Sequence, residues 1–154
     1  VFSTLHTNDA ATTLPRLLDM GVEPYLIAST VNIAIGQRLL RRLCDKCKVK
    51  SNVTKTELDS FGDDFASNII AGSLVYKAIG CSACNQTGYR GRVGIHEVLV
   101  MTPAVREAIL TRASARKLRQ IAINEGMVPI IEDGITKVLA GVSTIEEVLK
   151  MQHE

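Results

Sequence analysis

The spacing of hydrophobic positions changes along this chain, and each change predicts a different element. At the front, runs with strand character at 1–5 and 33–43 flank two segments with helical spacing. Asn8 or Asp9 is suited to cap the first of these helices, and Pro24 suits the first turn of the second. Because strands and helices alternate, the front of the chain is predicted to be α/β.

The rest of the chain passes from short strand-like runs to sustained helical spacing. Thr54-Lys55-Thr56-Glu57 has the form of a capping box and predicts a short helix, followed by a loop or weak helix at 63–72 and a strand at 74–79. The β-rich run 92–100 is the strongest strand candidate. After Pro103 the helical spacing continues to the end, which predicts a small helical layer.

Cysteine spacing indicates a metal site. Cys44, Cys47, Cys81 and Cys84 are the only cysteines, and they form two C-x-x-C pairs. Two residues between thiols let a tight turn aim both sulfurs at one ion, and a second such turn completes the tetrahedral shell of structural Zn²⁺. A structural disulfide pair or a thioredoxin-like redox dithiol is the alternative. The two turns favour zinc, and the long linker predicts that the ion closes a lobe at 44–88.

Several basic residues lie next to the first cysteine pair in the sequence. Four thiolates around one Zn²⁺ carry a net charge of about minus two, which cations and backbone N–H groups offset. The basic cluster therefore needs no external anion to explain it. Its members are Arg41, Arg42, Lys46 and Lys48.

The composition is that of a globular chain and disfavours some function classes. Of 154 residues, 46% are hydrophobic and 22% are charged, with a net charge of +2. With three Tyr, three Phe, no Trp and no long basic run, base stacking has few available side chains, so nucleic acid is not an expected partner. No run approaches the roughly 20 apolar residues of a membrane span. Because the chain opens without Met and directly in a strand-like run, we expect its natural start to lie upstream.

Four motif groups point together to one family. The first is Ser3-Thr4-Leu5-His6-Thr7-Asn8-Asp9-Ala10, which is similar to a histidine box, and the second is Gln37-Arg38-Leu39-Leu40-Arg41-Arg42-Leu43-Cys44. The third is Gly88-Tyr89-Arg90-Gly91-Arg92 with Gly94-Ile95-His96-Glu97, and the fourth is a tail with Glu125-Gly126-Met127, Glu132-Asp133-Gly134 and Gly141-Val142-Ser143-Thr144-Ile145-Glu146-Glu147-Val148. Together they resemble the hexameric ATPases that drive type II secretion and type IV pilus assembly.

The resemblance implies the carboxy-terminal part of a RecA-like nucleotide domain, with an inserted tetracysteine zinc lobe and a small helical carboxy-terminal layer. It divides the chain into the core at 1–43, the zinc lobe at 44–88, and a returning strand with a helical subdomain at 89–154. For the complete protein it implies a cytoplasmic homo-hexamer that binds ATP and Mg²⁺. The hexamer would act on a platform protein at the bacterial inner membrane.

The ATPase motifs of the resembled family lie before the histidine box. A phosphate-binding G-x-x-x-x-G-K-[S/T] loop does not occur in these 154 residues, and neither does a strand ending in the acids that organise Mg²⁺. We therefore expect the chain by itself not to hydrolyse ATP.

The resemblance also implies roles for residues around the histidine box. His6 would be the catalytic-site residue that senses the terminal phosphate; the alternative is a loop histidine bonded to a backbone carbonyl. Thr4, Thr7 and Asn8 would be polar groups on the phosphate side, although helix capping explains Asn8 equally well.

Two arginines before the first cysteine pair match paired arginines of the family. Arg38 and Arg41 are implied to contact nucleotide or a neighbouring subunit, because guanidinium is always charged and forks onto phosphate. The alternative is that they partner thiolates and surface carboxylates.

Two other function classes stay open at this level. A zinc-ribbon adaptor would bind protein or nucleic acid without catalysis, through the basic segment 38–50. A dithiol oxidoreductase would need a lowered thiol pKa and no bound metal. In the motor interpretation, the cysteines favour assembly over retraction, and the zinc lobe is expected to dock on the platform with Asp63 and Asp64 as steering charges.

Overall fold

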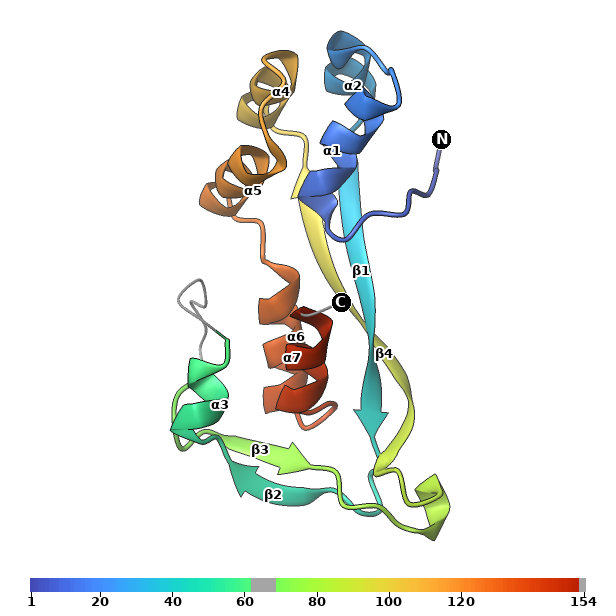
Figure 1. Ribbon diagram of the computed structural model, residues 1–154, viewed down its shortest axis with the longest axis vertical. Helices are drawn as coiled ribbons and strands as arrows, with labels where there is room; N and C mark the ends of the chain where they lie inside the picture. The colour runs from blue at the N-terminus through green and yellow to red at the C-terminus, as the bar shows by residue number, and fades with distance from the viewer. Residues whose placement is uncertain (62–68, 153–154) are drawn as a thin grey trace. The chain divides into compact units, whose positions relative to one another are not determined.

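The computed structural model describes residues 1–61 and 69–152, and its elements mix helices and strands (Figure 1). The chain divides into two compact units. The first unit combines Val1–Gln37 with His96–Ile130, and the second combines Arg38–Ile95 with Ile131–Glu154. Each unit is therefore assembled from two separate stretches of sequence.

Among the residues that the structure describes, four strands form two small sheets. The long strands β1 (Ile33–Leu43) and β4 (Tyr89–Val100) pair with each other, and both contribute residues to each unit. The short strands β2 (Val49–Asn52) and β3 (Leu74–Lys77) pair antiparallel, with Val49 opposite Lys77. The sequence predicted β1 at its observed bounds, and it predicted β4 three residues too short at the start.

Helices enclose the core of the first unit. In this unit α1 (Ala10–Asp19) packs on α5 (Ala115–Asn124), and α2 (Pro24–Thr30) packs on α4 (Pro103–Leu110). The buried side chains that hold these helices together include Ala10, Ala11, Leu14, Ile27, Leu99, Val105, Ile109 and Leu118.

Local capping explains where α1 begins and ends. The Asp9 carboxylate accepts a hydrogen bond from the backbone N–H of Thr12 at 2.7 Å, so Asp9 is the cap. The helix ends before Gly21, whose φ of +87° is readily adopted only without a side chain. The sequence had offered Asp9 as one of two candidate caps, the other being Asn8.

Within the described residues, the second unit also contains α3 (Lys55–Asp59), α7 (Ile145–Gln152) and all of α6 (Ile130–Leu139) except its first residue. The reciprocal capping box predicted between Thr54 and Glu57 starts α3. Helix α6 begins at the last residue of the first unit, and α7 follows it. Gly134 of α6 allows close packing on α7, because a side chain there would come within 3.1 Å of Val148.

The strand predicted at 1–5 is wrong. These residues adopt no regular structure, and Val1 and Phe2 are fully exposed. A strand needs a neighbour for its backbone hydrogen bonds, and the part of the chain that the structure describes offers residues 1–5 no such neighbour.

Part of the predicted loop or weak helix at 63–72, including Asp63 and Asp64, lies outside the described residues. Among the described helices, none is both long enough and apolar enough to cross a membrane.

Candidate functional site

The four cysteines come together in the second unit, as the two C-x-x-C turns predicted. Cys44 and Cys47 follow β1 directly, and Cys81 and Cys84 lie at the start and end of a single 3-10 turn. Their ligand atoms all lie within 4.8 Å of one another. The antiparallel pairing of β2 with β3 brings the two cysteine turns together, although a long segment separates them in the sequence.

The sulfur separations fit a tetrahedral metal shell. The Sγ atoms of Cys47 and Cys84, and of Cys81 and Cys84, are 3.8 Å apart, and those of Cys44 and Cys81 are 4.0 Å apart. Four sulfurs at about 2.3 Å from a central Zn²⁺ would be separated by about 3.8 Å. A disulfide requires about 2.05 Å, and all four cysteines are free. The arrangement is compatible with structural zinc.

Backbone donors stabilise one of the sulfurs as a thiolate. The N–H groups of Cys81 and Gly88 each point at Cys84 Sγ at 3.2 Å. Desolvation would raise the pKa of Cys84, but these donors outweigh it and lower the pKa to about 6. Gly88 is required at this turn, since its φ is +78° and a Cβ would lie 2.6 Å from that of Ala78.

The thiols differ in acidity across the cluster. Desolvation raises the pKa of Cys47 to about 12, and hydrogen bonds of its thiol with the other sulfurs add to this, although a backbone hydrogen bond from Gly80 acts in the opposite direction. Four adjacent thiolates would also repel one another. A cation bound at the centre would offset this repulsion and stabilise the deprotonated form of all four cysteines.

Arg42 and Lys48, two of the basic residues beside the first cysteine pair, have partners within the chain. Lys48 Nζ donates to Asp45 Oδ1 at 2.9 Å and to the Gly141 carbonyl at 3.0 Å. Arg42 pairs with the other oxygen of Asp45 at 3.3 Å. These contacts agree with the interpretation that the basic cluster serves internal partners.

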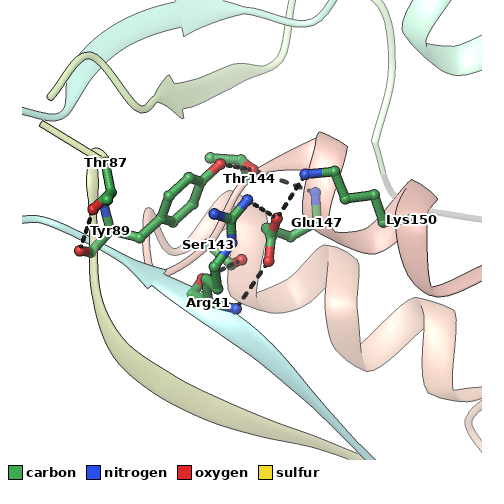
Figure 2. A network of polar contacts seen from close by, with 7 residues as sticks. All are labelled: Arg41, Thr87, Tyr89, Ser143, Thr144, Glu147 and Lys150. Carbon is green, nitrogen blue, oxygen red and sulfur yellow. Dashed lines mark hydrogen bonds and ion pairs between the residues drawn. The ribbon is translucent and has the colours of Figure 1, made fainter.

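Arg41 of β1 lies at the centre of a polar network that also includes Tyr89 of β4 and Glu147 of α7 (Figure 2). Its Nη2 donates to Glu147 Oε1 at 2.6 Å, and its backbone N–H donates to Glu147 Oε2 at 3.1 Å. The guanidinium also stacks 4.0 Å from the centre of the Tyr89 ring, and the Tyr89 hydroxyl bonds to Thr144 at 3.0 Å. Ser143 Oγ closes the network by donating to the Arg41 carbonyl at 2.9 Å.

The network holds Glu147 ionised despite its burial. Desolvation would raise the pKa of Glu147, but the hydrogen bonds from Arg41 outweigh it, and the pKa lies below its ordinary value. The same hydrogen bond raises the pKa of Arg41. The carboxylate that Arg41 binds is buried and belongs to α7.

Arg38 and Arg41 both line a pocket of about 460 Å³ in the second unit. Four cations surround this pocket against a single carboxylate. The sequence pointed to the two arginines of β1, and the pocket brings them together with Arg92 of β4 and with residues of α7. The pocket is lined by Arg38, Leu39, Leu40, Arg41, Arg92, Glu147, Lys150 and Met151.

The histidine-box residues lie in the first unit, ahead of α1. His6, Thr4 and Asn8 are exposed, and His6 stands in a segment without regular structure. Thr7 is half-buried, and its hydroxyl bonds to that of Thr13 at 2.9 Å. Asp9, not Asn8, caps the helix, so capping does not account for Asn8.

Two buried carboxylates with distant partners were missed by sequence reasoning. Glu97 and Glu147 are both buried and both bind partners far away in the chain. A usable signal existed in each case. Glu97 occupies the inward position between Ile95 and Leu99 in a strand. Glu147 follows Thr144 at the spacing of a capping box, and its N–H donates to the Thr144 hydroxyl.

The chain is similar to known proteins along nearly its whole length. The family model described as type II/IV secretion system protein matches residues 1–150. A type IV pilus assembly ATPase PilB from Thermus thermophilus is 44% identical over 97% of this chain and 16% of its own length. A type II secretion system protein E from Aeromonas hydrophila is 41% identical over 100% of this chain and 30% of its own length.

A further relative, a type IV pilus assembly ATPase PilB from Myxococcus xanthus, is 43% identical over 97% of this chain and 26% of its own length. The chain therefore spans less than a third of each of these curated relatives.

Proposed function

This chain belongs to the type II/IV secretion system protein family, and we therefore propose that it forms the carboxy-terminal part of a motor ATPase for type II secretion or type IV pilus assembly. The observation that carries the proposal is the similarity, along the whole chain, to relatives named pilus assembly ATPases. In the complete protein, ATP hydrolysis would drive a ring of six copies. The ring would act on a platform protein at the cytoplasmic face of the bacterial inner membrane.

The nucleotide chemistry is proposed to involve the histidine segment of a RecA-like domain. A group that senses the terminal phosphate must be reachable by it, and the exposure of His6 and Thr4 supports that role. Asn8 is exposed as well, and we propose the same role for it, whereas the Thr7 hydroxyl is half-buried and bonded to Thr13. The phosphate loop and the Mg²⁺-organising acids would come from the part of the complete protein that precedes the histidine box.

Arg38 and Arg41 are proposed to have different tasks. The Arg41 guanidinium binds Glu147 and stacks on Tyr89, so a structural role within the second unit suits it better than phosphate binding. Arg38 faces the same basic pocket and is the better candidate for contact with nucleotide or a neighbouring subunit.

The cysteine cluster is proposed to hold one structural Zn²⁺ through all four thiolates. In the three-part division, the ion would close the lobe at 44–88 between the core at 1–43 and the helical part at 89–154, and these boundaries stay a prediction. A lobe stapled by metal presents a fixed surface, which suits docking on the platform. Structural zinc would also make the dithiol oxidoreductase unnecessary as an explanation.

A zinc-ribbon adaptor without catalysis is the weaker hypothesis. It would explain the cysteines but not the similarity that continues through the histidine segment and the last helix. The segment on which it relied is also occupied, because Arg41, Arg42 and Lys48 have carboxylate partners inside the chain.

Phosphate release by the complete protein and by this chain alone tests the proposal. We expect Mg²⁺-dependent hydrolysis by the complete protein and none by the chain alone. In the complete protein, His6→Ala should lower kcat by at least tenfold while ATP binding changes little, since the lost interaction belongs to the transition state. His96→Ala, at an exposed histidine of β4, is the matched control. Salt-dependent DNA binding without hydrolysis would instead support the adaptor.

A further inference from the structure

A fully buried carboxylate in the first unit joins the starts of two helices. Glu97 lies on β4, where it occupies an inward position like Leu99, although its side chain ends in a carboxyl group. Its side chain is 0% exposed. A buried charge is costly unless partners replace its lost water, so the surroundings of Glu97 must supply them.

The partners of Glu97 are two helix starts and one arginine. Its Oε1 accepts from the backbone N–H of Ala10 at 2.7 Å, and its Oε2 accepts from that of Ile130 at 3.1 Å. Ala10 is the first residue of α1 and Ile130 the first of α6. The N–H groups at these positions have no partner within their own helices, and the helix dipole makes them favourable toward an anion. Arg119 of α5 adds a guanidinium at 3.5 Å.

The neighbouring strand leaves no room for this arrangement to shift. A Cβ added to Gly36 of β1 would lie 3.0 Å from the backbone nitrogen of Ala10 and 3.0 Å from Cγ of Glu97. Glycine at this position therefore permits β1, β4 and the start of α1 to meet closely. The contact of Glu97 with Ala10 is enclosed from this side.

We propose that Glu97 is a positioning residue for the histidine segment. By holding the N–H of Ala10, it fixes the point from which residues 6–9 leave α1, and through Ile130 it ties that point to the start of α6. The proposal rests on the function proposed above for His6. Glu97 touches no nucleotide in this account, since it is buried while His6 is exposed.

The contact of Glu97 with α1 does more than stabilise the helix. Asp9 already caps α1 through Thr12, so the helix does not need Glu97 in order to form. What Glu97 adds is a contact across 87 residues of sequence, which sets where the helix start lies relative to β4. A catalytic group displaced by about 1 Å commonly loses about a hundredfold in rate, so the position matters.

A double-mutant cycle in the complete ATPase tests the proposal. Glu97→Gln, which removes the charge and places an amide donor among N–H donors, should lower kcat by about tenfold to a hundredfold with KM changed less than about threefold. Because Glu97 would act through His6, the double variant Glu97→Gln/His6→Ala should be no slower than His6→Ala alone. Glu107→Gln removes the same charge from an exposed site of the first unit and should leave kcat unchanged.

Backbone hydrogen exchange supplies a readout independent of activity. Glu97→Gln should speed exchange at Ala10 and Ile130 together, because one carboxylate protects both amides. If this variant does not fold, Gly36→Ala disturbs the same contact from β1 and leaves the carboxylate in place; it should show the same loss of kcat and the same non-additivity with His6→Ala.

The outcomes separate the two proposals. If the losses of kcat from His6→Ala and from Glu97→Gln multiply fully in the double variant, the positioning role is overturned. The ATPase proposal then stays intact. Unchanged exchange at Ala10 would do the same. Normal turnover of His6→Ala would instead overturn the role of the histidine, and the positioning role with it.

Discussion

Replacing Glu147 by glutamine should weaken the attachment of α7 within the second unit. Glu147 is 9% exposed and accepts hydrogen bonds from the guanidinium and the backbone N–H of Arg41. The amide of glutamine keeps one acceptor oxygen but places a donor against the donors of Arg41. The variant therefore loses a charge-assisted interaction without losing volume.

The size of the loss follows from burial and charge. A hydrogen bond to a charged group contributes about 1.5–3 kcal/mol. The Arg41 side chain is 45% exposed, so water recovers part of its interaction and the lower half of that range applies. We expect a loss of about 2 kcal/mol in the free energy of unfolding.

Urea unfolding followed by circular dichroism measures this loss, with zinc held at one concentration because metal binding shifts apparent stability. Glu146→Gln, the exposed neighbour on α7, is the matched control and should cost less than about 0.5 kcal/mol. In a cycle with Arg41→Ala, the coupling energy should be about 1–2 kcal/mol. Equal losses for the two glutamates, or a coupling energy near zero, would refute the reasoning.

Three further predictions concern the same unit. Cys81→Ser should abolish stoichiometric zinc, measured by elemental analysis, and unfold the lobe, since metal binding contributes folding free energy there; retained zinc contradicts it. Gly88→Ala should weaken zinc binding and cost more stability than Gly91→Ala by at least 1 kcal/mol, because both have φ +78° but only Gly88 meets a neighbour. The pKa of Glu147 lies below its ordinary 4.5, so its contribution is present above about pH 4.5 and lost as pH falls further; the stability gap to Glu147→Gln, measured by urea unfolding, should shrink there, and a constant gap contradicts it.

Local physics made much of the fold readable from the sequence. The Asp9 cap, the Thr54 capping box and the positive φ of Gly21 each depend on residues within a few positions of one another. The bounds of β1 and the pairing of sulfurs within each C-x-x-C turn follow in the same way, since two-residue turns place sulfurs in pairs. These features need no knowledge of the distant chain.

Prediction from the sequence failed for strands whose formation depends on a neighbouring strand elsewhere in the chain. Residues 1–5 have the composition of a buried strand, but strand formation is decided by a neighbouring strand, and the described residues provide none there. The pairing of β2 with β3 was missed for the same reason, because β2 is too short and too polar to stand out without its partner.

By itself, then, the sequence determined the capped helices, the long strands, the tetracysteine turns and the family, all of which are encoded by neighbouring residues or by motif identity. Only the tertiary structure decided what Glu97 and Glu147 do. Glu97 meets Ala10 across 87 residues and Glu147 meets Arg41 across 106, and both carboxylates are buried. Nothing near either glutamate in the sequence indicates its partner, because a buried charge is tolerated only where the folded chain brings donors to it.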